Sequence, residues 1–63
     1  MWKIDNYGNA VNTETDDEIY IVLCPDGLYR VYHNNKVVGA FRENAAAVSF
    51  IERKVEEFEN DER

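Results

Sequence analysis

Cys24 and His33 are the two side chains in this 63-residue chain best suited to nucleophilic or acid–base chemistry, and each is the single residue of its type. A catalytic pair needs the base within hydrogen-bonding reach of the nucleophile, and a third group that orients the base. The strand pattern described below places Cys24 and His33 on opposite faces and at opposite ends of one hairpin. We therefore expect a surface histidine, a small apolar cysteine and a protein that is not an enzyme.

Three consecutive acids, Asp16, Asp17 and Glu18, precede the first strongly apolar segment. Adjacent carboxylates do not converge on one point, and the spaced oxygen ligands and glycine of a calcium loop are missing. The chain also lacks a glycine-rich phosphate loop and paired cysteines, so we expect no metal and no cofactor. Two interpretations of the acids remain: charges that guard a strand edge, or charges that face a partner.

Residues 18–41 are the part of the chain that must position these side chains. They form β-branched and aromatic runs separated by two turn signals. Pro25 fixes φ in the first turn and Gly27 accepts a left-handed conformation, while Asn34 and Asn35 tolerate positive φ in the second. The pattern predicts three antiparallel strands.

The turns set a register, and the register sorts the side chains into two faces. The single predicted helix can cover only one of them, so the other face is a candidate contact surface. The predicted core face carries Ile19, Ile21, Leu23, Tyr29, Val31, Val38 and Ala40. The second face carries Tyr20, Val22, Cys24, Leu28, Arg30, Tyr32, Val37 and Phe41.

An amphipathic helix is predicted over residues 44–59, where Ala47, Ile51, Val55 and Phe58 share one stripe. Residues 60–63 should be a frayed tail, because the acids there oppose the helix dipole. The first four residues are a candidate extra strand and residues 5–17 a loop, which together could cover the second face or leave it open. The predicted fold is α+β: one domain, residues 1–63, with a three- or four-stranded antiparallel meander and a C-terminal helix on one face.

The net charge of −6 is distributed unevenly along the chain. Residues 1–27 carry −5, residues 28–42 carry +3 and residues 43–63 carry −4. No apolar run reaches the length of a membrane span, no signal-peptide pattern opens the chain, and a single cysteine cannot form an intramolecular disulfide. We expect a cytoplasmic protein with no membrane partner.

The sequence favours an acidic protein-binding module that docks on a partner with a basic surface and regulates or inhibits it. The predicted anchor is Tyr20, Val22, Arg30, Tyr32 and Val37, because Tyr and Arg are enriched at interface centres. The predicted flanking acids are Asp16, Asp17, Glu18, Glu56 and Glu59. In size and charge the chain resembles the small acidic inhibitors made by phages and mobile elements, which implies a basic nucleic-acid-handling protein as the target.

Two alternatives use the same residues differently. The second face could join copies of the chain in a homodimer, which would help so short a domain to fold. The positive hairpin could instead bind nucleic acid. A three-stranded sheet followed by a helix is similar to the arm-binding domains of phage integrases, which implies insertion of the sheet into a DNA groove. Three cations in a chain of charge −6 argue against that function.

Overall fold

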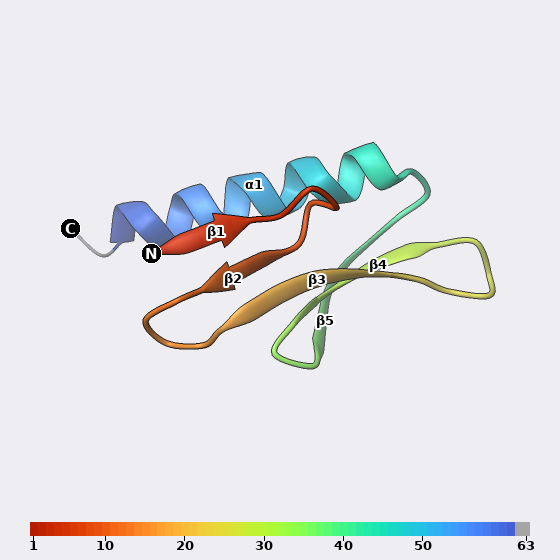
Figure 1. The fold of residues 1–63 in the computed structure, drawn as a ribbon. Helices are drawn as coiled ribbons and strands as arrows, with labels where there is room; N and C mark the ends of the chain where they lie inside the picture. Colours follow the sequence, from red (N-terminus) through yellow and green to blue (C-terminus); the bar gives the residue numbers. More distant parts are fainter. Residues whose placement is uncertain (62–63) are drawn as a thin grey trace.

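The computed structural model describes residues 1–61 of the chain. Within them, every strand pairs antiparallel with its neighbour in sequence, in the order β1-β2-β3-β4-β5, and one helix follows (Figure 1). The elements are β1 (Trp2–Ile4), β2 (Ala10–Asn12), β3 (Glu18–Leu23), β4 (Tyr29–His33), β5 (Lys36–Phe41) and α1 (Asn44–Asp61). The predicted α+β meander with a C-terminal helix is confirmed, and the sheet has five strands, one more than the largest number predicted.

Both predicted turns lie where the residue types placed them. Gly27 has φ +85°, and Asn34 and Asn35 have φ +50° and +73°, all in the left-handed region that these residues tolerate. The turn at Gly27 is closed by its amide, which donates to the carbonyl of Cys24 over 2.9 Å. The predicted register between β3 and β4 is confirmed along the whole pair.

The register between β4 and β5 changes partway, because β5 contains a β-bulge at Val38. Tyr32 pairs with Val37 as predicted, but Val31 pairs with Gly39, so every later residue of β5 is on the face opposite to the predicted one. The placement of Phe41 on the second face and of Ala40 in the core was therefore wrong. Val38 is 43% exposed, so it is not a core residue either.

The bulge turns the Phe41 ring to the helix side, where it lies 5.3 Å from the ring of Phe50. Gly39 makes room for that ring, since a Cβ built there would meet Phe41 Cε2 at 3.0 Å. The shifted register therefore brings two aromatic rings from different elements into contact.

Residues 5–17 contain β2 and are not the continuous loop that was predicted. β1 and β2 continue the sheet beyond β3 and do not fold over its second face (Figure 1). Trp2 is only 7% exposed, as expected of a core aromatic, whereas Tyr7 at the β1–β2 turn is 79% exposed and does not pack on the core. The N-terminal segment therefore widens the sheet and leaves one face without cover.

Helix α1 covers the other face, and its predicted stripe is the one that packs. Ala47, Ile51 and Val55 are buried against Ile19 and Val31, with Phe58 partly buried beside them. Each large apolar side chain buried in this way contributes about 1.5–3 kcal/mol. Leu23 is on the helix side of β3 but is 61% exposed, so the predicted core face is covered only in part.

The helix continues through Asn60 and Asp61, two residues past its predicted end, even though its last turn holds no basic residue. The predicted end of the helix at residue 59 is therefore two residues too early. Glu62 and Arg63, the rest of the predicted tail, lie outside the described residues.

Candidate binding face

The five predicted anchor residues lie together on the side of the sheet that faces away from α1, here called the outer face. The pairings Tyr20 with Tyr32, Val22 with Arg30 and Tyr32 with Val37 carry them across β3, β4 and β5. Val22 on β3 is 38% exposed and Val37 on the edge strand β5 is 53% exposed, so both present apolar surface to solvent. The structure thus brings the predicted anchor together on one uncovered surface.

Tyr20 and Tyr32 form the centre of the outer face. Their rings are stacked, with centroids 5.5 Å apart and planes 5° from parallel. The hydroxyl of Tyr20 donates to Oδ1 of Asn35 over 2.9 Å, so the β4–β5 turn fixes the first ring. The pair is therefore held in place before any partner arrives.

Arg30 is fixed on the outer face by Asp26, four residues earlier. Its two terminal nitrogens donate to the two carboxylate oxygens over 3.2 and 2.8 Å. The guanidinium, and then the amide of Leu28, hold the pKa of Asp26 below its usual range. In turn Asp26, followed by Cys24, raises the pKa of Arg30. The planar cation is held rigid, and its charge is largely compensated.

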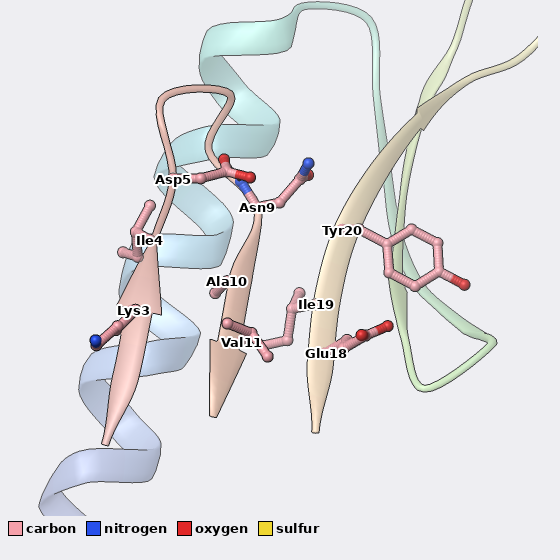
Figure 2. A pocket seen from close by; sticks show the side chains of 9 residues that line it. All are labelled: Lys3, Ile4, Asp5, Asn9, Ala10, Val11, Glu18, Ile19 and Tyr20. Carbon is pink, nitrogen blue, oxygen red and sulfur yellow. The ribbon is translucent and has the colours of Figure 1, made fainter. Parts of the chain in front are cut away.

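The outer face continues into a hollow of about 410 Å³ over β1, β2 and β3. Lys3, Val11 and Glu18 form a row across the three strands here, and Tyr20 borders the row (Figure 2). Asn9 lines the hollow just before β2 begins, and its Oδ1 accepts the amide of Ile21 on β3 over 3.0 Å. The volume falls within the range of small-molecule sites.

Sequence reasoning missed this hollow. It depends on β2, which is only three residues long and lies between polar turns. The available signal was the pair Ala10-Val11 inside a polar stretch. Two residues are too few to show the alternation of apolar and polar side chains that indicates a strand.

The acids at the β2–β3 turn have different surroundings. Asp17 accepts from the Thr15 hydroxyl and from Nδ2 of Asn34, both over 2.7 Å, and these two bonds lower its pKa. It links the β2–β3 turn to the β4–β5 turn and is a structural residue. Asp16 and Glu18 are exposed, and Glu18 lies opposite Val11 on the outer face.

The predicted acids of the helix, Glu56 and Glu59, are exposed, and α1 lies on the opposite side of the sheet from the anchor. Of the five predicted acids, Glu18 shares the outer face with the anchor, because it alternates with Tyr20 along β3. The helix acids contribute to the field of the whole molecule, not to the contact surface.

The register places Cys24 and His33 at opposite ends of the β3–β4 hairpin, as the sequence predicted. His33 is partly buried between aromatic rings, with Phe58 at 5.5 Å and Trp2 at 6.4 Å between centroids, so the expectation of a surface histidine was wrong. In the part of the chain that the structure describes, no three His, Cys, Asp or Glu side chains are grouped to hold a metal ion. Among residues 1–61, no helix has the length and apolarity that a bilayer crossing requires.

Comparisons with protein-family models, with curated proteins and with solved structures found no match.

Proposed function

We propose that this protein is a non-catalytic binding module that docks through its outer face on a macromolecular partner and regulates or inhibits it. The partner that fits best is a protein with a basic surface, in the manner of the small acidic phage and mobile-element inhibitors that the chain resembles in size and charge. The site of action would be the cytoplasm, where the thiol of Cys24 would remain reduced.

One observation carries the proposal: β1 and β2 widen the sheet instead of covering it. The five anchor residues are consequently left on a surface that residues 1–61 do not cover: Tyr20, Tyr32, Val22, Val37 and Arg30. A continuous surface of this kind, with apolar and aromatic centre and polar rim, is typical of protein interaction sites.

The fixed geometry of the anchor also supports docking. Tyr20 is tied to Asn35 and Arg30 to Asp26, so few rotamers are lost when a partner binds. Ordering a flexible side chain at an interface costs about 0.5–1.5 kcal/mol. The acids at the rim and the net charge of −6 would speed the approach of a positively charged surface.

Self-association is the second candidate, and the charge balance of the outer face favours it. Lys3 and Glu18 offset each other there, and Arg30 is compensated by Asp26, so two outer faces could meet without strong repulsion. The same compensation weakens the third candidate, nucleic-acid binding, because it removes Arg30 from the cations available to phosphates.

Affinity capture from the native host tests the proposal. Tyr32→Ala and Arg30→Glu should lose the captured partner while circular dichroism shows the fold retained. Arg53→Glu makes the same charge reversal on the helix side and should keep the partner. Capture that survives both outer-face variants would contradict docking through this surface. Light scattering tests the second candidate. If the parent protein has the mass of a dimer and Tyr32→Ala has the mass of a monomer, self-association replaces docking on a partner as the function of the outer face.

A further inference from the structure

β5 forms a free edge of the sheet, and it is the longer of the two edges. It has six residues, whereas β1 at the other edge has three. Val37 and Val38 on this edge are 53% and 43% exposed, and the strand contains no proline. An edge strand presents unpaired backbone groups that can accept a further strand.

A hollow of about 370 Å³ lies beside this edge on the helix side. It is lined by apolar and aromatic side chains, with Lys54 as the one cation: Ile19, His33, Val38, Phe50, Lys54 and Phe58. A smaller hollow shares Phe50 and Lys54 and continues along α1 past Arg53 and Glu57. Strand edge and hollow together make a groove between β5 and α1, here called the edge groove.

The bulge at Val38 couples the two parts of the edge groove. It places Val38 in the lining of the hollow while Val37 stays on the outer face opposite Tyr32. A strand added beside β5 could therefore pair with the edge and direct a side chain into the hollow, because side chains alternate along a strand.

The charge of the edge groove is positive, in contrast to the rest of the chain. Lys36 and Arg42 lie at the two ends of β5, and residues 28–42 contain no acid. On the helix side Lys54 lies 5.6 Å from the Phe50 ring centre and 3.5 Å from the Glu57 carboxylate, with Arg53 next to it. Glu57, and Glu43 just past Arg42, offset only part of this charge.

This charge pattern argues against a second copy of the chain as the occupant. Two β5 strands paired antiparallel about Gly39 would place Lys36 of each copy opposite Arg42 of the other. Like charges directly opposite each other destabilise a strand pair. An extended segment with acids at those two positions would instead place a negative charge opposite Lys36 and another opposite Arg42, and both pairs would be favourable.

We propose that the edge groove binds an extended acidic segment of another protein. The segment adds to the sheet as a sixth strand beside β5, and one apolar side chain fills the hollow between Val38, Phe50 and Phe58. Its acids lie near Lys36, Arg42 and Lys54. The hollow lies on the side of the sheet opposite the outer face, and the two sites share only strand β5 with its residue Val37, so the protein would hold two partners of opposite charge.

Selection from a display library of random nine-residue peptides on the immobilised full chain tests this proposal. Enriched peptides should carry an apolar residue flanked by acids and should lack a central proline. In spectra of the ¹⁵N-labelled protein, the selected peptide should shift the amides of residues 36–41 and of residues 50–58, and leave Tyr20 unchanged.

Two matched pairs of variants locate the site. Val38→Gln should weaken the selected peptide about tenfold or more, as expected for loss of an apolar anchor, and Val37→Gln on the other face should change affinity less than about threefold. Lys54→Glu should weaken binding, whereas Lys3→Glu makes the same change of charge on the outer face and should not. Tyr32→Ala should leave the peptide bound, even if it abolishes docking of the outer-face partner.

Three results would overturn the proposal. One is a selection with no enriched peptide, or with enriched basic peptides. Another is a peptide whose amide shifts fall on the outer face. The third is a chain that dimerises through β5 without peptide, since a second copy would then be the occupant.

Discussion

The rings of Tyr20 and Tyr32 stack on the uncovered side of the sheet, with centroids 5.5 Å apart and planes 5° from parallel. Their side chains come from directly opposite positions of β3 and β4. Such an aromatic pair contributes about 0.5–1.5 kcal/mol beyond the area it buries. The pair therefore supports the sheet as well as offering a contact surface, and the two roles can be separated.

A double-mutant cycle separates them. Tyr20→Ala and Tyr32→Ala, alone and together, should show a coupling of about 0.5–1.5 kcal/mol in the free energy of unfolding from urea titrations. Tyr20→Phe keeps the stacked ring and removes only the hydrogen bond to Asn35, so it should destabilise the fold less than Tyr20→Ala. Additive single variants would show that the stacking carries no energy.

Gly8 is predicted to be the glycine least tolerant of a side chain. Its φ is +88°, and a Cβ built there would lie 2.5 Å from Cγ2 of Val48 on the helix. Gly27 has φ +85° with open space around it, so a substitution there measures only the cost of placing a residue with a side chain in this backbone conformation. Gly27→Ala should cost about 1–2 kcal/mol of unfolding free energy, from backbone conformation alone.

Gly8→Ala should cost about 1–3 kcal/mol more than Gly27→Ala, because it adds overpacking against α1. Val48→Ala in the Gly8→Ala background should restore part of the difference. Thermal unfolding of these three variants and of the parent protein checks this. Equal losses for the two glycines would show that the β1–β2 turn does not press against the helix.

Stability should fall in acid through Asp17. Its bonds to Thr15 and Asn34 depress its pKa below the ordinary value of 3.8. A carboxylate with a depressed pKa in the folded state stabilises the protein above its unfolded pKa, and this contribution is lost as the pH falls through the folded value. Asp17→Asn should therefore flatten the dependence of unfolding free energy on pH near and below the ordinary pKa of 3.8.

Thr15→Ala removes the larger of the two causes and should move the pKa of Asp17 back toward its ordinary value. The carboxyl chemical shift of Asp17, followed during a pH titration, measures this directly. Identical pH profiles for the parent protein and Asp17→Asn would mean that the link between the two turns does not depend on the ionised carboxylate.

Local backbone chemistry explains why part of the fold was predictable. Gly27, Asn34 and Asn35 specify turns through their own φ preferences, and the turn at Gly27 fixes the register of β3 and β4. The buried stripe of the helix could also be predicted, because apolar residues recur with a period of 3.6 from Ala47 to Phe58. The anchor followed from these two signals, and the structure places all five of its residues on one face.

The errors lie where distant packing decides. The bulge at Val38 brings Phe41 onto Phe50, and those two residues belong to different elements. Gly39 was the available clue, since an isolated glycine in a strand pattern often marks a bulge. β2 was missed because Ala10–Asn12 gains its order from pairing with β1 and β3 on both sides. The hollow over these strands was missed with it.

Protection of tyrosines in the captured complex tests the outer face most directly. Hydroxyl-radical footprinting reports how readily each ring is oxidised, and Tyr7, 79% exposed at the β1–β2 turn, provides an internal reference. Docking through the outer face predicts that oxidation of Tyr20 and Tyr32 falls in the complex while that of Tyr7 is unchanged. Unchanged oxidation of Tyr20 and Tyr32, or protection of Tyr7 alone, would contradict it.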